Sequence, residues 1–295
     1  MSELSAQRRM WALFEPIHAV TYFAPQARAA FETAGLRGFW RGYFAGRSAP
    51  LGPIGPAPVV ASFFGFNPPM VGRALPDVWT RITPEDALAA RLSGATEALT
   101  AVWSDVDAAS IAGAAELLRA AATGIEVQGR VLGAANAALP WPPDTEPVQV
   151  LWHAATILRE QRGDGHVAAL LTAGLDGCET VVWRSALADA ENGGANPARA
   201  FFQPARGWTD DDWAAATERL AARGWLHADG TPTAEAHRAF AAAEVVTDRL
   251  ARGPWDRLGA DATERLARLL APLTARASTY LPHPNPIGLP PPLTV

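Results

Sequence analysis

Apolar residues recur at helical spacing along most of the chain. Over residues 4–22, Trp11, Phe14, Ile17 and Val20 lie three residues apart, which places their side chains on one face of a helix. Similar patterns predict further helices at 25–34, 37–46, 84–103, 107–122, 127–138, 148–160, 166–175, 178–190, 197–204, 213–223 and 260–278. The pattern therefore predicts a mainly α protein.

Interruptions in these patterns predict where helices kink or end. Pro16 lies inside the first helix and favours a kink or break there, because proline cannot donate the backbone hydrogen bond. Gly163-Asp164-Gly165 predicts a turn between two helices, and the apolar run VVASFF (59–64) fits either a helix or a strand. Thr83 and Thr209 each precede acidic residues, a pattern typical of a helix N-cap.

The segment LPWPPDTE, residues 139–146, is the clearest linker in the chain, because its prolines cannot continue a helix. We place a domain boundary there. The expected organisation is a helical ligand-pocket domain (1–139), a winged-helix-like domain (146–280) and a proline-rich tail (281–295) that cannot fold alone.

The segment GWLHADGTPTAEAHRAF, residues 224–240, follows a helix that ends at Gly224. The pair Asp229-Gly230 between two short extended runs predicts a β-hairpin, and a new helix begins near Thr233. Helix, hairpin and helix in this order are typical of the end of a winged helix-turn-helix. The predicted fold is therefore helical with a C-terminal winged helix-turn-helix-like segment carrying one small β-hairpin.

Charge is unevenly distributed along the chain. All 25 basic residues are arginine; residues 1–81 carry eight of them against four acids, and residues 82–295 carry seventeen against twenty-six. This balance argues against a chain-wide nucleic-acid surface and allows an anion-binding pocket near the front. Cys178 is the single cysteine, and the apolar runs are too short to span a membrane, so we expect a cytoplasmic protein.

An aromatic and arginine-rich stretch, residues 37–47, is the strongest candidate for a ligand site. Aromatic rings supply the apolar walls of a pocket, and an arginine fork pairs with carboxylate or phosphate. The candidate ligand-binding residues here are Arg37, Trp40, Arg41, Tyr43, Phe44 and Arg47. A core of stacked aromatics covered by arginines explains the same stretch equally well, so both interpretations stay open.

The histidines supply candidate chemistry. His18 lies four residues before Tyr22, so both face the same way on a helix and form a candidate catalytic pair. His153 and His166 are candidate ligand-binding residues. With His18 and either Glu160 or Asp164 they are the candidate ligands of a divalent metal, and His18 is also a candidate haem ligand. The alternative for each histidine is ordinary helix packing.

Two stretches together resemble a known family: EPIHAVTYF…GLRGFWRGYFAGRSAPLG (15–52) and REQRGDGHVAALL (159–171), followed by the winged-helix-like end. They resemble a conserved actinobacterial family described as SalK-like. The resemblance implies a winged-helix fold related to MarR-type regulators and implies no particular activity.

Three functions remain open. The first is binding of an anionic or aromatic small molecule between the front helices and residues 150–170, with catalysis by His18 and Tyr22 as an extension. The second is a ligand-responsive, MarR-type DNA-binding regulator, which three consecutive aspartates before the predicted recognition helix disfavour. The third is a metal- or haem-dependent enzyme. The helix at 260–278 is a candidate arm for a homodimer.

Overall fold

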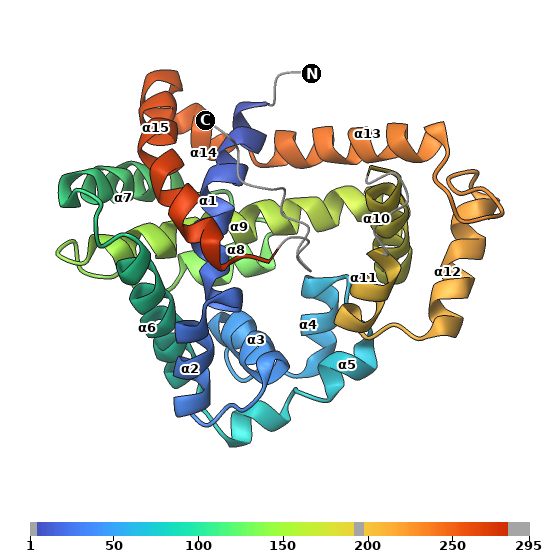
Figure 1. The fold of residues 1–295 in the computed structure, drawn as a ribbon, viewed down its shortest axis with the longest axis horizontal. Coiled ribbons are helices and arrows are strands. Elements are labelled where there is room, and N and C mark those ends of the chain that lie inside the picture. The colour runs from blue at the N-terminus through green and yellow to red at the C-terminus, as the bar shows by residue number, and fades with distance from the viewer. Residues whose placement is uncertain (1–4, 192–197, 283–295) are drawn as a thin grey trace. The chain divides into compact units, whose positions relative to one another are not determined.

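The computed structural model describes residues 5–191 and 198–282. This part of the chain is almost entirely helical (Figure 1). Its α-helices are α1 (Ala6–Phe23), α2 (Pro25–Thr33), α3 (Phe39–Ser48), α4 (Pro56–Phe63), α5 (Pro68–Gly72), α6 (Pro84–Val102), α7 (Ala108–Ala122), α8 (Val131–Ala137), α9 (Pro147–Thr172), α10 (Gly177–Glu191), α11 (Ala198–Arg206), α12 (Asp210–Ala222), α13 (Ala234–Leu250), α14 (Gly253–Leu258) and α15 (Ala260–Ala277). Three 3₁₀ turns add Ala49–Leu51, Asp77–Thr80 and Ser278–Tyr280. The mainly α prediction is confirmed. Residues 59–63 of the apolar run lie in α4, and Phe64 follows the helix as its C-cap.

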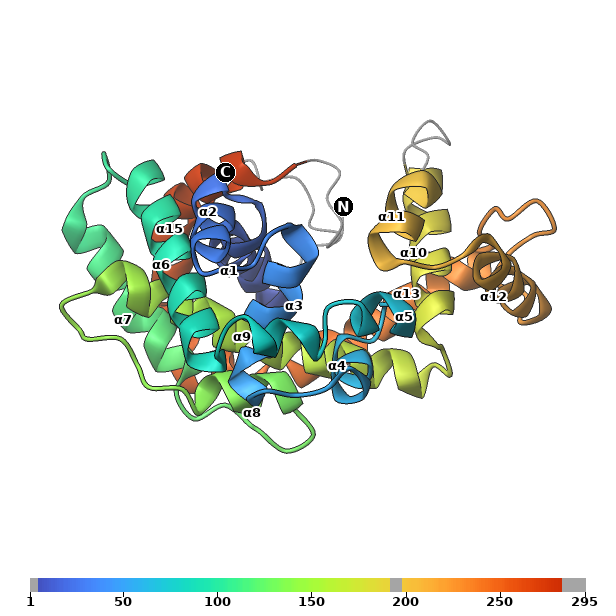
Figure 2. The same ribbon diagram turned by 90° about the horizontal axis from the view of Figure 1, so that it is seen from below.

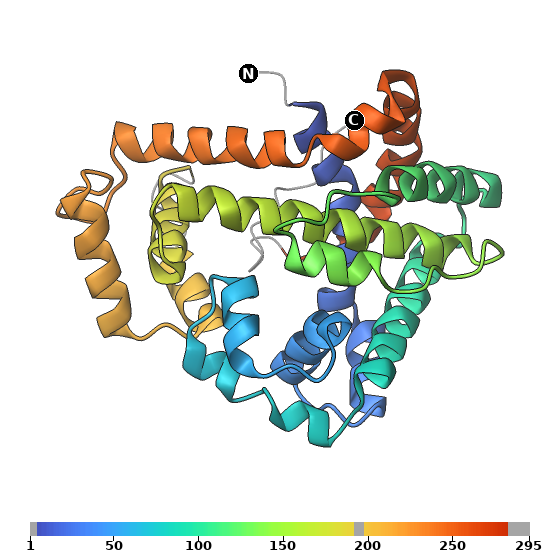
Figure 3. The same ribbon diagram turned by 180° about the vertical axis from the view of Figure 1, so that it is seen from behind.

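The predicted turn at Gly163-Asp164-Gly165 is wrong, because α9 continues through it to Thr172. Each glycine inside a helix costs about 1 kcal/mol relative to alanine. Tertiary contacts offset this cost: Asp164 is buried and accepts a 2.8 Å hydrogen bond from the backbone N–H of Gly133 in α8. Figure 3 shows α8 (bright green) lying along α9 (yellow-green). Helix α1 likewise runs through Pro16 without a break.

The predicted β-hairpin is also wrong, since no strand occurs in the described ranges. A single isolated antiparallel bridge joins Leu226 and Pro232. The ladder does not extend because Asp229 takes the backbone N–H of Thr231 at 2.9 Å, while the His227 carbonyl accepts from Gly230. The Asp229 side chain therefore occupies a backbone N–H that a longer hairpin ladder would need. Both predicted N-caps, Thr83 and Thr209, are confirmed.

The chain divides into two compact units. Unit 1 is Met1–Ile54, Pro76–Asp164 and Asp248–Val295; unit 2 is Gly55–Leu75 and Gly165–Thr247. The boundary that we predicted at residues 139–146 is an irregular segment inside unit 1. The division into domains 1–139 and 146–280 concerns independent folding and stays a prediction. Of the predicted tail, 281–295, residues 283 onward lie outside the described chain.

Unit 1 is built around α1 and the first part of α9. Their apolar faces, with those of α6, α7, α14 and α15, form one continuous core that includes Phe14, Ile17, Trp152 and Leu270. Burying each such large side chain contributes roughly 1.5–3 kcal/mol. The core fixes the spacing between α1 and α9, and polar side chains of both helices meet beside it.

Unit 2 carries the helix-turn-helix-like elements α10 to α13. Its core includes Leu170, Trp183, Trp213 and Leu220. The early segment 55–75 belongs to this unit: the Trp208 indole donates to the Gly65 carbonyl at 3.0 Å, and the Asn67 amide donates to Asp212 at 3.2 Å. No described helix combines the length and apolar character that crossing a membrane requires.

The close packing of α2 on α6, visible in Figure 2, depends on Gly94. A Cβ at this position would lie 2.6 Å from Ala27 Cα, a backbone atom that cannot move aside alone. We expect Gly94→Ala to lower the free energy of unfolding by about 2 kcal/mol, measured by urea denaturation.

Gly113 in α7 is the matched control for Gly94. A Cβ there would meet only Leu269 Cδ1 at an ordinary 3.6 Å. Gly113→Ala should raise the free energy of unfolding by about 0.5–1 kcal/mol, because alanine is the better helix former. Equal effects of the two substitutions would contradict the close approach of α2 and α6.

Candidate functional site

Glu160 of α9 is the centre of a buried charge network in unit 1. Its carboxylate accepts two hydrogen bonds from Arg47 of α3, at 3.0 and 3.1 Å, and forms an ion pair with Arg159 at 2.8 Å. Arg159 also donates to Glu15 of α1 at 3.2 Å, and the Trp11 indole donates to the other oxygen of Glu15 at 3.0 Å. The network therefore ties three helices together through charged groups that are withdrawn from water.

The charges in this network stabilise one another. Burial opposes ionisation of Glu160, but the adjacent positive charges of Arg159 and Arg47 prevail and hold the pKa of its carboxyl well below the usual range. Burial likewise opposes the charge of both arginines, and Glu160 raises the pKa of each guanidinium above its usual value. All three groups are charged at neutral pH.

His18 and Tyr22 of α1 lie next to this network. His18 Nε2 is 2.9 Å from the Tyr22 hydroxyl, and His18 Nδ1 is 2.9 Å from Thr156 Oγ1 of α9. Burial, together with the charge of Arg159, lowers the pKa of His18 well below its usual value, so the ring is neutral. Burial raises the pKa of the Tyr22 phenol, so it stays protonated. The predicted i, i+4 pair is thus in hydrogen-bond contact.

Arg91 of α6 is a third buried arginine in this region. Its guanidinium donates to the Gly46 carbonyl at 2.9 Å and to Asn136 at 3.2 Å, and lies 5.3 Å from the centre of the Trp152 ring. Burial lowers its pKa to about 10. Its contacts are dipoles and a π face rather than a carboxylate.

A partly exposed cluster of aromatic rings adjoins the network; we call Tyr22, Phe39, Trp40 and Tyr43 the aromatic face. The Tyr22 and Tyr43 rings are 5.1 Å apart, and Phe39 lies 6.0 Å from Tyr43 and 4.8 Å from Trp40. The Tyr43 hydroxyl accepts from Arg47 at 3.2 Å. A small cavity of about 20 Å³, lined in part by Tyr22, Phe39 and Tyr43, opens at this face.

The other predicted residues of this stretch are dispersed. Phe44 is fully buried against Trp40, Arg37 is exposed, and Arg41 is half-buried. Arg47, predicted as an anchor for an anion, is instead paired with Glu160.

The structure does not gather the predicted metal ligands. His153 is buried with its ring edge-on to Trp141 at 4.8 Å, and burial, with the charges of Arg91 and Arg119, lowers its pKa to about 4. His166 belongs to unit 2, where its Nδ1 lies 3.0 Å from Thr247 Oγ1. Among the described residues, no three histidine, cysteine or acidic side chains form a group that can hold a metal ion.

Sequence reasoning missed several members of the network. Thr156 and Arg91 have ordinary helical surroundings in the sequence and gave no signal. A sequence signal did exist for the members of the network on α1. They recur every three or four residues along one side of the helix, at Trp11, Glu15, His18 and Tyr22. Glu160 was predicted only as a metal ligand, whereas it accepts from arginine.

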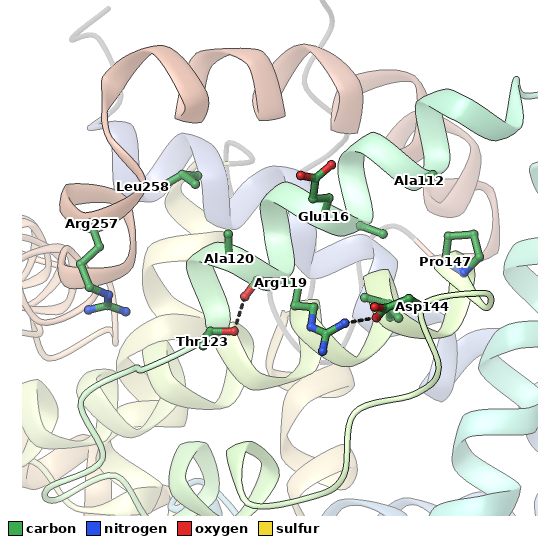
Figure 4. Close-up of a pocket in the computed structure, with 11 residues that line it drawn as sticks. Ala112, Glu116, Arg119, Ala120, Thr123, Asp144, Pro147, Arg257 and Leu258 are labelled. Atoms are coloured by element: carbon green, nitrogen blue, oxygen red, sulfur yellow. Dashed lines mark hydrogen bonds and ion pairs between the residues drawn. The ribbon is translucent and has the colours of Figure 1, made fainter.

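A larger groove of about 660 Å³ lies elsewhere in unit 1, on α7, α14 and the start of α9 (Figure 4). Its floor is apolar and includes Ala115, Val150 and Leu258. At one end Arg119 is paired with Asp144, as the dashed line in Figure 4 marks. No buried polar side chain lines it, so the groove lacks the fixed polar anchors of the aromatic face.

Helix α12, which occupies the position of a recognition helix, has few positively charged groups available to bind the phosphate backbone of DNA. Its arginines are engaged within unit 2: Arg219 binds Asp176 and Glu179, and Arg223 donates to the carbonyls of Ala173 and Gly174. The exposed residues of its remaining surface are Asp210, which pairs with Arg199, and Asp211, Ala214, Ala215, Glu218 and Ala222. The bridge-closed loop after it exposes Asp229 and no arginine. This surface repels phosphate rather than attracting it.

The order of α10 to α13, with a short bridged loop between α12 and α13, defines a helix-turn-helix protein joined to a helical unit. Comparison with known families agrees: residues 7–281 match a helix-turn-helix family, and the chain belongs to that family. No curated protein matches the sequence, and no solved structure matches the fold.

Proposed function

We propose that this protein binds a planar aromatic small molecule at the aromatic face, and that its helix-turn-helix does not read DNA. One observation carries the proposal: buried charged and imidazole groups hold two phenol hydroxyls, those of Tyr22 and Tyr43, at a partly exposed cluster of aromatic rings. His18 and Tyr22, predicted as a catalytic pair, are assigned a binding role here.

The energetic cost of the network supports a role beyond packing. Burying ions costs several kcal/mol each, and apolar residues of similar volume often stabilise a core equally well. The network fixes the positions of Tyr22 and Tyr43, and fixed polar groups on apolar walls are typical of ligand sites. The existing cavity holds about one water molecule, so a ligand requires Phe39, which is 37% exposed, to rotate outward.

Binding can be tested with simple phenols by isothermal titration calorimetry. Tyr22→Phe and Tyr43→Phe should each weaken binding about tenfold, the usual effect of one lost hydrogen bond. Tyr280→Phe is the matched control. The Tyr280 hydroxyl bonds Gln26 and the Ala98 carbonyl and Tyr280 does not line the cavity, so the affinity of this variant should equal that of the unmodified protein. Equal affinity in all three variants would reject the aromatic face as the site.

The family match favours a second candidate function, a ligand-responsive DNA-binding regulator related to MarR-type proteins, as the SalK-like resemblance implies. The surface of α12 argues against it. We expect no binding to duplex DNA by fluorescence anisotropy even at about 50 mM salt, where phosphate contacts are strongest.

A charge-reversed variant provides the positive control for this assay. Asp211 and Glu218 are exposed on α12, and Asp211→Arg with Glu218→Arg should create measurable, salt-dependent DNA affinity. DNA binding by the unmodified protein that weakens steeply with salt would instead support the regulator.

A further inference from the structure

A chain of three hydrogen bonds links a backbone carbonyl to the aromatic face. It begins at the Trp152 carbonyl, which accepts from the Thr156 hydroxyl at 2.9 Å. His18 bridges Thr156 and Tyr22, with 2.9 Å on each side of its ring. A carbonyl oxygen can only accept, so the carbonyl end fixes the direction of the whole chain.

The direction follows from counting hydrogens. Thr156 has one hydroxyl hydrogen and donates it to Trp152, so its oxygen accepts from His18 Nδ1–H. The neutral imidazole has a single N–H, so His18 Nε2 is an acceptor and receives the hydroxyl hydrogen of Tyr22. The Tyr22 oxygen is left with lone pairs and no hydrogen to give to a ligand.

The reversed direction is less favourable in the unliganded protein. If Thr156 donated to His18 Nδ1, then Nε2–H would donate to Tyr22, and the Trp152 carbonyl would lose the hydroxyl bond. The reversed chain makes two hydrogen bonds within the protein instead of three, and a hydrogen bond contributes about 0.5–1.5 kcal/mol net. The resting state is therefore the one in which Tyr22 donates inward.

The charged and titratable groups that act on His18 and Tyr22 come from three helices packed against α1. They are Tyr43 and Arg47 on α3, Arg91 on α6, and Arg159 and Glu160 on α9. Among them the three arginines outnumber the one carboxylate, and this positive charge disfavours an ammonium group on the ligand. The exposed Arg28–Glu32 pair at the cavity mouth is neutral as a unit.

We infer that the ligand is a neutral aromatic molecule that donates a hydrogen bond to the Tyr22 oxygen, such as an un-ionised phenol or a neutral aryl amine. This inference rests on the proposed function and narrows it: a phenolate or carboxylate meets a lone pair at Tyr22, whereas a phenol O–H or aryl N–H meets an acceptor. The protein therefore selects the protonation state of its ligand through the direction of the hydrogen-bond chain. Thr156 fixes that direction and is separated from the ligand by His18 and Tyr22.

A titratable probe distinguishes the outcomes in one experiment. 4-Nitrophenol absorbs differently as phenol and phenolate, so its pKa when bound is read from its spectrum. We expect binding to raise that pKa by about one unit, a tenfold preference for the neutral form. A lowered pKa would overturn the inference while leaving the site in place, and no binding at all would overturn both.

Thr156 provides the decisive variant, because it touches neither the ligand nor Tyr22. In Thr156→Val the Nδ1–H loses its acceptor, so His18 adopts the other tautomer and donates to Tyr22, whose hydroxyl then points outward. The preference should reverse, with the bound probe shifting about tenfold toward the phenolate, whereas Thr156→Ser should behave as the unmodified protein. An unchanged preference in Thr156→Val would overturn the inference.

Nitrogen-15 NMR tests the chain without any ligand. The His18 ring should show the Nδ1–H tautomer in the free protein and the Nε2–H tautomer in Thr156→Val, with His18→Gln used to assign its signals. An Nε2–H tautomer in the unmodified protein overturns the inference whatever the outcome for the proposed function.

Discussion

Glu160→Ala is expected to lower the free energy of unfolding by about 3–5 kcal/mol, measured by urea denaturation at neutral pH. The substitution leaves Arg47 and Arg159 as buried positive charges without their shared carboxylate, since both interact with Glu160 at 3.1 Å or less. Removing one partner of a buried pair costs far more than the pair itself contributes. The effect should exceed that of any exposed ion pair in the chain.

Glu264 supplies the control. It pairs with Arg9 on the surface, where both side chains are 46% exposed, and Glu264→Ala should change the free energy of unfolding by less than about 1 kcal/mol. A similarly small effect of Glu160→Ala would show that Arg47 and Arg159 reach water.

The contribution of Glu160 to the free energy of unfolding also depends on pH. Because the folded-state pKa of Glu160 is below its unfolded value, this contribution is present above about pH 4 and is lost as the pH falls.

Asp164→Asn is expected to do the opposite and raise the free energy of unfolding at pH 8 by about 3 kcal/mol. Burial raises the pKa of the Asp164 carboxyl to about 6, although the backbone N–H of Gly133 partly compensates. A carboxyl with a raised folded-state pKa costs stability when it ionises, so the cost grows from about pH 4, the unfolded value, to about pH 6 and is constant above. An asparagine oxygen still accepts from Gly133 and carries no charge.

The measurement is the difference between the unfolding free energies of Asp164→Asn and the unmodified protein from pH 3 to 8. It should be close to zero at the acid end and reach its plateau near neutral pH. Asp105 is a control of opposite sign: its hydrogen bond to Arg276 lowers its pKa, so Asp105→Asn should be slightly destabilising above pH 4. A flat difference for Asp164 would mean that its carboxyl is solvated.

The spacing of apolar residues predicted the helices well, because apolar residues at helical spacing are the ones that the helix buries. The caps at Thr83 and Thr209 and the contact of His18 with Tyr22 are local as well, within four residues. The errors came where a specific contact outweighed the local backbone preference, a distant contact in one case and a contact within the turn itself in the other. Gly163 and Gly165 favour a turn, yet packing of α8 against α9 keeps the helix intact, and one carboxylate, Asp229, prevents the hairpin ladder.

The charge network shows the same limit at the candidate site. Arg47 reads as an anion-binding residue in the sequence, but its anion is Glu160, 113 positions later. Nothing near Arg47 indicates that partner. Similarly, Arg219 and Arg223 look available for phosphate until the fold places acidic side chains and carbonyls against them. The sequence indicates which residues are chemically suited to a site, but it does not indicate which residues they pair with in the fold.

The interleaved chain path of the two units has a consequence for biosynthesis. Residues 55–75 emerge from the ribosome first, yet their partners, such as Trp208 and Asp212, follow only after all of residues 76–164 have been translated. Translating the roughly 130 residues between this segment and Trp208 takes roughly 7–27 s at about 5–20 residues per second, and during this time Phe64 has no core to pack against. A gene fragment encoding residues 165–247 alone would lack this segment, so a soluble helix-turn-helix module requires residues 55–75 to be supplied in trans or by circular permutation.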